Sequence, residues 1–363
     1  MSQKKINKDT LKNRDGVSNE EITNKAAIAK LKAKRKESTS AESLAKAIIQ
    51  GDTIALSQAI TLIESTNISH TEKANEILAL CLPHANNSIR IGITGVPGVG
   101  KSTFIETLGS HIATKQNRLA VLAVDPSSSV TKGSILGDKT RMENLVNNQN
   151  VYIRPSAAGT SLGGVARKTR ESIILCEACG FKTIFIETVG VGQSETAVHS
   201  MVDFFLLLKL AGAGDELQGI KRGIIELADA IVINKADGET IKTAEKAKVE
   251  FNRALHLYPP KQNGWIPKVM LASALENRGI SNTWELIENY ISEAKKSNYF
   301  IAKRTEQNKF WLHQTIEDQL KSNFYQNDTI KKELQQQLRL IEQNKTTPFA
   351  AAQHLLSLAS TLL

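Results

Sequence analysis

The chain has 363 residues, 41% of them hydrophobic, and a formal net charge of +9. This length allows one large domain or two ordinary ones, and no apolar run reaches the roughly 18 residues that a membrane-spanning helix needs. Residues 1–40 contain 11 Lys and Arg against 5 Asp and Glu, so most of the excess positive charge belongs to one arm. The rest of the chain therefore gives little reason to expect a nucleic-acid partner.

Residues 1–39 have few large apolar side chains, and we expect them to form a disordered basic arm. Residues 40–88 follow a helical pattern with a break at Gly51 and Asp52, which predicts two or three short helices. Over residues 89–298, short apolar runs alternate with helical patterns. Strands are expected at 90–94, 119–125, 151–154, 183–187, 203–210, 230–234 and 267–271, and helices at 101–115, 164–178, 217–228 and 239–254.

Many of these strand segments are apolar without alternation, which is typical of strands covered by helices on both faces. The series of strand and helix predicts an α/β fold with a doubly wound, mostly parallel sheet. The ligand site of such a sheet lies beyond the carboxyl ends of its strands.

Residues 299–363 show only helical patterns. Apolar residues recur at helical spacing in three segments, and Thr347 and Pro348 are expected to be the cap and first residue of the last helix. Apolar stripes of this kind pack either on the same domain or on a second copy of the chain, and both possibilities remain open from this pattern.

The three cysteines are Cys81, Cys176 and Cys179. They are too few for a disulfide framework and suit a reducing cytoplasm, where we expect the protein to reside. Cys176 and Cys179 form one C-x-x-C pair without a second pair, so they are interpreted as packing residues rather than a redox or metal site.

The segment GVPGVGKST, residues 95–103, lies between a predicted strand and a predicted helix and matches the G-x-x-x-x-G-K-[ST] phosphate loop. Its glycines let backbone N–H groups point at phosphate oxygens, and the helix adds the positive end of its dipole. Lys101 would reach the β- and γ-phosphates, and Ser102 would ligate Mg²⁺. The predicted contact residues are Gly95, Val96, Pro97, Gly98, Val99, Gly100, Lys101, Ser102 and Thr103.

The segment IVINKADG, residues 231–238, carries the pattern N-K-x-D at the end of another predicted strand. Guanine presents two adjacent N–H donors that one carboxylate can accept, and adenine lacks that pair, so Asp237 would select guanine. Lys235 can lie over the ring, and Asn234 can brace the loop. Ser273, Ala274 and Leu275 follow the last predicted strand and fit a backbone contact to guanine O6.

Several acids are placed to help with Mg²⁺. Glu187 ends a predicted strand, as the metal-assisting acid of phosphate-loop proteins does, and would act through a metal-bound water. Asp125 and Asp138 are further candidates for holding the metal or orienting the attacking water. Gly190 would sense the γ-phosphate through its backbone N–H, which would make residues 190–195 a switch. Lys221 and Arg222 are candidates for a second mobile segment.

The motifs GITGVPGVGKSTFIE, VLAVDPSSS, GDKTRM, ETVGVGQSE, GDELQGIKRGIIELAD and INKADG together resemble the methylmalonyl-CoA mutase-associated GTPases, of the bacterial MeaB/ArgK and human cobalamin-A types. The resemblance runs from about residue 40 to the C-terminus. It implies a homodimer formed through C-terminal helices, and a GTPase that gates cofactor loading and protects an adenosylcobalamin-dependent acyl-CoA mutase. It also implies that Asp125, Asp138 and Glu187 lie near the metal and that Lys221 lies in a segment responding to the mutase.

The residues and the resemblance together predict a GTP phosphohydrolase that uses Mg²⁺ and cycles between GTP and GDP, with a mutase and a second copy of itself as partners and neither nucleic acid nor membrane. Two alternatives were weighed. A nucleotide-dependent kinase of a transport system would need a phospho-acceptor, for which no segment of the sequence gives a sign. A metal-inserting maturation GTPase would need a Cys/His cluster, and the sequence offers only Cys176 and Cys179.

Overall fold

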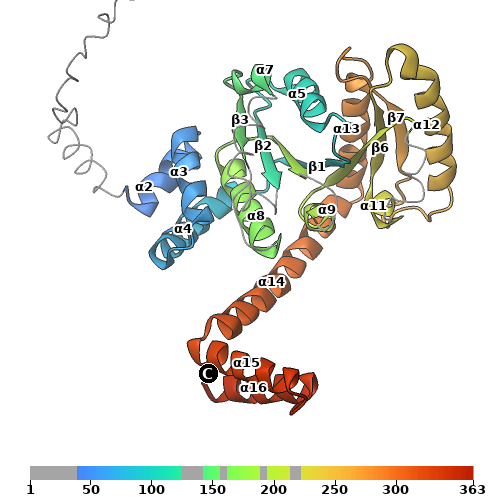
Figure 1. Cartoon of the computed structure of the whole chain (residues 1–363). Helices are drawn as coiled ribbons and strands as arrows, with labels where there is room; N and C mark the ends of the chain where they lie inside the picture. The colour runs from blue at the N-terminus through green and yellow to red at the C-terminus, as the bar shows by residue number, and fades with distance from the viewer. Residues whose placement is uncertain (1–38, 125–141, 156–161, 189–193, 213–221, 363) are drawn as a thin grey trace, which may run out of the picture. The chain divides into compact units, whose positions relative to one another are not determined.

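The computed structural model describes residues 39–124, 142–155, 162–188, 194–212 and 222–362. The described residues from Ala41 onward belong to one unit, whose strands and helices are shown in Figure 1. The strands are β1 (Ile89–Gly95), β2 (Leu119–Val124), β3 (Val151–Arg154), β4 (Thr183–Thr188), β5 (Phe204–Leu210), β6 (Ala230–Asn234) and β7 (Lys268–Leu271).

The helices precede, connect and follow these strands, with two 3₁₀ turns, η1 (Leu82–His84) and η2 (Gly238–Thr240). They are α2 (Ala41–Ile49), α3 (Thr53–Glu64), α4 (Ile68–Cys81), α5 (Lys101–Ile112), α7 (Glu143–Val146), α8 (Leu162–Ala178), α9 (Ser194–His199), α11 (Arg222–Leu227), α12 (Ile241–Leu255), α13 (Ile280–Lys296), α14 (Tyr299–Gln326), α15 (Asp328–Glu342) and α16 (Pro348–Leu362).

The seven strands form one sheet in the order β3-β2-β4-β1-β5-β6-β7, and every neighbouring pair is parallel. The strand β1 lies at the centre, between β4 and β5. After β1, the chain adds β2, β3 and β4 on one side of this central strand. It then crosses over and adds β5, β6 and β7 on the other side. The predicted doubly wound fold is confirmed. In such a sheet the ligand site is expected where the strand order reverses, which here is the carboxyl end of β1.

Helices cover both faces of the sheet, which explains why the strands are apolar throughout (Figure 1). Side chains from α5, α7 and α13 pack on one face in a cluster that contains Ile91, Phe185 and Leu206. Helices α8 and α9 pack on the other face against residues such as Phe205, and α11 and α12 cover the β6 side of that face. Alternate residues of a strand therefore point into different clusters.

The helices α2, α3 and α4 share the apolar cluster of α8, and the predicted break between the first two lies at Gly51, which adopts φ +92°. Asp52 caps α3 by accepting hydrogen bonds from the Ile54 and Ala55 amides. At the other end of the chain, α16 begins with Pro348, and the Thr347 hydroxyl accepts from the Ala350 amide. The predicted break at Gly51 and Asp52 and the predicted start of the last helix are confirmed.

Candidate active site

The phosphate loop connects β1 to α5 through three glycines with positive φ: Gly95 at +156°, Gly98 at +80° and Gly100 at +89°. A Cβ atom on Gly95 would lie 2.6 Å from the carbonyl oxygen of Leu208, and one on Gly100 would lie 2.9 Å from Nδ2 of Asn234. Larger residues would therefore push the loop away from β5 and β6. Glycine is required here both for the backbone conformation and for close packing.

Lys101 is the first residue of α5, and its ammonium group folds back onto the loop. The Nζ atom donates to the carbonyl oxygen of Gly95 at 2.8 Å and to that of Val96 at 3.4 Å. Ser102 and Thr103 follow in the first turn of the helix, where backbone N–H groups lack intrahelical acceptors. A cation, a hydroxyl and a helix N-terminus therefore converge at the carboxyl end of β1, which is an arrangement suited to anions.

Asn234 joins this loop to the neighbouring strand ends. It is the last residue of β6 and is 2% exposed. Its Nδ2 donates to the Val99 carbonyl at 2.9 Å, and its Oδ1 accepts from the Ala274 amide at 3.3 Å. One buried amide side chain thus holds the phosphate loop and the segment after β7 in a fixed relation.

Asp237 and Ser273 form a second junction. The Ser273 hydroxyl donates to Oδ2 of Asp237, and the Asp237 carbonyl accepts from the hydroxyl of Thr240. Lys235 precedes them in a left-handed conformation with φ +58° and an exposed side chain, and Leu275 is 85% exposed. The segments 234–237 and 273–275 therefore lie together, although they are distant in sequence.

Glu187 lies in β4, directly beside Ile93 of β1 in the sheet register, and is 5% exposed. Phe185, two residues earlier, packs in the same cluster as α5, so strand alternation puts Glu187 on the α5 face too. Ser102, the second residue of α5, belongs to the helix that covers this face. Two oxygen-bearing side chains at this edge are the donor type that Mg²⁺ prefers, and each fits the role of a direct or water-mediated metal contact.

Four predicted site residues, namely Asp125, Asp138, Gly190 and Lys221, lie outside the described residues. Within the described ranges, no group of three or more His, Cys, Asp and Glu side chains is arranged to hold a metal ion. Cys81, Cys176 and Cys179 carry free, buried thiols. Burial raises the pKa of Cys176 well above its ordinary value and that of Cys81 to about 11, so both are neutral packing groups near pH 7.

Three residues that support the site were not singled out from the sequence. The Thr107 hydroxyl, on α5, donates to the Ala274 carbonyl at 2.9 Å, and Arg278 donates to the Ala236 carbonyl. Gly279 adopts φ +72°, and a Cβ there would lie 2.2 Å from the Leu271 carbonyl oxygen. A glycine directly before an apolar helical pattern was the one available signal; Thr107 and Arg278 act through contacts between distant segments, which a sequence does not display.

Among the described residues, no helix is both long enough and apolar enough to span a membrane.

Comparisons with known proteins agree with this geometry. A family model described as methylmalonyl Co-A mutase-associated GTPase MeaB matches residues 56–329. A probable GTPase of Mycobacterium tuberculosis is 49% identical over 319 residues, covering 88% of this chain and 95% of that protein. GTPase ArgK of Escherichia coli is 41% identical over 312 residues, with 86% and 94% covered.

The methylmalonic aciduria type A homolog of Mus musculus, a mitochondrial protein, is 42% identical over 331 residues, covering 88% of this chain and 80% of that protein. A crystal structure titled LAO/AO transport system kinase superposes with a TM-score of 0.71 at 33% identity, covering 89% of this chain and 98% of that one. The phosphate loop, the strand ends around it and these matches together assign this chain to the MeaB family of methylmalonyl-CoA mutase-associated GTPases.

Proposed function

We propose that this protein hydrolyses GTP to GDP and phosphate with the help of Mg²⁺ and acts as a chaperone for an adenosylcobalamin-dependent acyl-CoA mutase, with methylmalonyl-CoA mutase as the client. The observation that supports the nucleotide part is the Asn234 bridge, which joins the phosphate loop at Val99 to the segment after β7 at Ala274. The family and the mutase named in its description support the client.

The chemistry proposed for the site is positioning and charge neutralisation rather than covalent catalysis. Lys101 now donates to two neutral carbonyls. Moving its ammonium to the β- and γ-phosphates would replace these neutral acceptors with negatively charged ones, so that both donor and acceptor of each hydrogen bond would be ionised. Ser102 and Glu187, with Asp125 and Asp138, would hold Mg²⁺, which supplies further neutralisation of phosphate charge.

Guanine selection would rest on Asp237. Its carboxylate is held by the Ser273 hydroxyl through Oδ2, which orients the group before a base arrives. A carboxylate in this position accepts the two N–H donors of guanine, and adenine cannot supply them. Lys235 and Leu275, both exposed beside it, would cover the faces of the base.

The test of the nucleotide part is competition against a fluorescent GDP analogue. We expect GDP and GTP to displace it and ATP to fail. The variant Asp237→Asn should lose GDP, while the neighbouring exposed control Glu239→Gln should retain it. Equal displacement by ATP and GTP would remove the guanine assignment.

The client is tested separately, by gel filtration of the protein with methylmalonyl-CoA mutase in GDP and in a non-hydrolysable GTP analogue, and by phosphate release with and without mutase. A complex and a faster release are expected. No complex in any nucleotide state would refute the chaperone role, and transfer of labelled phosphate to another protein would favour a kinase.

A homodimer through the C-terminal helices completes the proposal. Three apolar side chains on α14 lie largely in solvent: Leu312 is 61% exposed, Ile316 48% and Leu320 60%. They continue into a groove of about 460 Å³ that is lined by Leu320, Phe324 and Leu356 among others. Contiguous exposed apolar surface of this kind marks an interaction site. In sedimentation velocity, Leu320→Glu should dissociate the dimer, and Gln319→Glu, on the adjacent exposed position, should not.

A further inference from the structure

The face of α14 that packs on the sheet domain combines buried polar groups with aromatic side chains. Arg304, Gln307 and Trp311 are the buried residues of this 28-residue helix, and the apolar stripe of Leu312, Ile316 and Leu320 faces away. Buried polar groups are costly unless they are hydrogen-bonded in a defined geometry. A polar contact face therefore fixes the position of the helix more strictly than an apolar one would.

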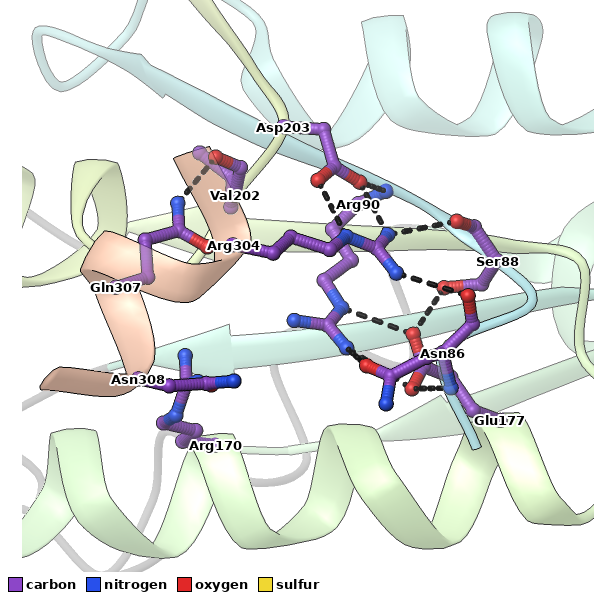
Figure 2. A network of polar contacts seen from close by, with 10 residues as sticks. All are labelled: Asn86, Ser88, Arg90, Arg170, Glu177, Val202, Asp203, Arg304, Gln307 and Asn308. Atoms are coloured by element: carbon purple, nitrogen blue, oxygen red, sulfur yellow. Dashed lines mark hydrogen bonds and ion pairs between the residues drawn. The ribbon is translucent and has the colours of Figure 1, made fainter. Parts of the chain in front are cut away.

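Four side chains of α14 bind the short connection between α9 and β5, and we call them the α14 anchor: Lys303, Arg304, Gln307 and Trp311. Figure 2 shows two of them, Arg304 and Gln307, beside Asp203 and Val202 of the connection. Gln307 Nε2 donates to the Val202 carbonyl at 2.8 Å, Trp311 Nε1 to the Ser200 carbonyl at 3.1 Å, and Lys303 Nζ to the Asp203 carbonyl at 2.8 Å. Arg304 forms a two-point pair with the Asp203 carboxylate at 2.8 and 2.7 Å.

The same connection also touches β1, the strand that ends in the phosphate loop. Oδ2 of Asp203 accepts from the Arg90 amide at 2.8 Å, and the Asp203 amide donates back to the Arg90 carbonyl at 2.8 Å. At Gly92, an added Cβ would lie 2.9 Å from Val198 of α9 and 3.1 Å from Val202. The side chains of Val198 and Val202, together with that of Phe205 in β5, thus pack directly against the backbone of β1 at Gly92.

A second ionic group strengthens this junction. Arg90 pairs with Glu177 of α8 at 2.9 Å, and the Ser88 hydroxyl and Asn86 amide donate to the same carboxylate. Arg304 donates to the Asn86 and Ser88 carbonyls as well. Figure 2 shows the two guanidinium groups and two carboxylates interleaved between β1, α8 and α14. Each guanidinium and carboxylate of this network has several partners, which leaves the junction few alternative arrangements.

We propose that α14 is a lever: the α14 anchor makes the position of α14, and of α15 and α16 beyond it, follow the α9–β5 connection, so that the nucleotide state at the sheet sets the placement of the C-terminal helices. The inference rests on the proposed nucleotide binding and deepens it by a coupling between two sites. From Gln307 to the end of α14 the helix is about 28 Å long at 1.5 Å per residue, so a tilt of about 10° at the anchor moves its far end by roughly 5 Å.

The lever is tested by spin-label distances within one protomer. Labels are placed at Glu250→Cys on α12 and Ser357→Cys on α16, both exposed positions, and labelled chains are mixed with an excess of unlabelled chains. Cys81, Cys176 and Cys179 are buried and are not expected to react. We expect the mean distance to differ by several ångströms between GDP and a non-hydrolysable GTP analogue.

Two anchor variants carry the test. Gln307→Met removes the donor to the Val202 carbonyl with little change in volume, and Trp311→Phe removes the donor to the Ser200 carbonyl. Each should reduce the nucleotide-dependent difference to less than half. The matched control is Gln319→Met, because that exposed amide bonds only within the helix, to Asn323, and it should behave as the wild type.

Nucleotide affinity is measured on the same labelled samples. Tight binding with equal distances in both nucleotides, or an undiminished difference in both anchor variants, would overturn the lever alone. Failure to bind guanine nucleotide would overturn the proposed function and the lever with it. A difference that is present in the wild type and the control but reduced in both anchor variants would support it.

Discussion

Replacing Asn234 with alanine tests how the phosphate loop is held. The substitution removes a donor to the Val99 carbonyl at 2.9 Å and an acceptor for the Ala274 amide at 3.3 Å. Val99 is fully buried and Ala274 is 6% exposed, so water cannot readily replace the lost partners. A buried polar group left without a partner costs about 1–3 kcal/mol.

The longer contact to Ala274 is the weaker one, so we expect a total of about 2–4 kcal/mol for Asn234→Ala. If this cost falls wholly on nucleotide binding, the Kd for GDP rises roughly 30- to 900-fold. Any share that falls on folding appears as a lower free energy of unfolding without nucleotide. The two measurements together should therefore account for the total.

The assay is titration with a fluorescent GDP analogue, paired with urea unfolding of the nucleotide-free protein. Asn289→Ala is the matched control, because Asn289 is an exposed residue in the middle of α13. It should change neither quantity measurably. If Asn234→Ala binds GDP within about threefold of the wild type and unfolds at the same urea concentration, the Asn234 bridge does not hold the site.

Three further expectations concern stability. Gly279→Ala should lower the free energy of unfolding by at least about 2 kcal/mol, because a Cβ there would meet a backbone oxygen at 2.2 Å. The control Gly264→Ala, at φ +76° with open space around it, should cost only about 1 kcal/mol in urea unfolding. Equal losses in the two variants would contradict the steric reason. Burial lowers the pKa of His199 to about 3, below the roughly 6.5 of the unfolded chain. The unfolded state therefore binds the extra proton in this window, and stability should fall by up to about 1.4 kcal/mol per pH unit as the pH drops below 6.5; His199→Gln should lose that part of the slope, and an unchanged slope would refute the assignment. Glu177→Gln should lower the free energy of unfolding by about 3–5 kcal/mol, because it leaves the buried guanidinium of Arg90 without its carboxylate partner. Glu171→Gln, in a partly exposed pair on the same helix, should lower it by under about 1 kcal/mol in the same unfolding assay. Similar losses would show that the buried charge does not matter.

The sheet and its order of elements were predictable because the pattern is local. A run such as Ile231–Ile233 is apolar on both faces, and only a strand covered by helices on both sides buries it fully. The phosphate loop was predictable for the same reason, since Gly95, Gly98 and Gly100 each meet a backbone requirement that no other residue meets as well. Spacing within one segment determines such features.

Contacts between distant segments were decided only by the tertiary structure. The sequence suggested that Asn234 braces a loop, but the identity of its partners, Val99 and Ala274, depends on how β6, α5 and β7 come together. Thr107 shows the same limit, since a threonine on a helix gives no sign that its hydroxyl meets a carbonyl 167 positions later.

The C-terminal helices show the division most clearly. Their apolar spacing determined by itself that helices form, and it left open which face packs on the protein's own domain. In the folded chain the apolar stripe at Leu312, Ile316 and Leu320 is largely exposed, and the buried face carries Arg304 and Gln307 beside Trp311. Hydrophobic periodicity reports that a face needs a partner but does not identify it. The buried face of α14 was set instead by carboxylates and carbonyls at the amino end of β5, whose positions exist only once the sheet has formed.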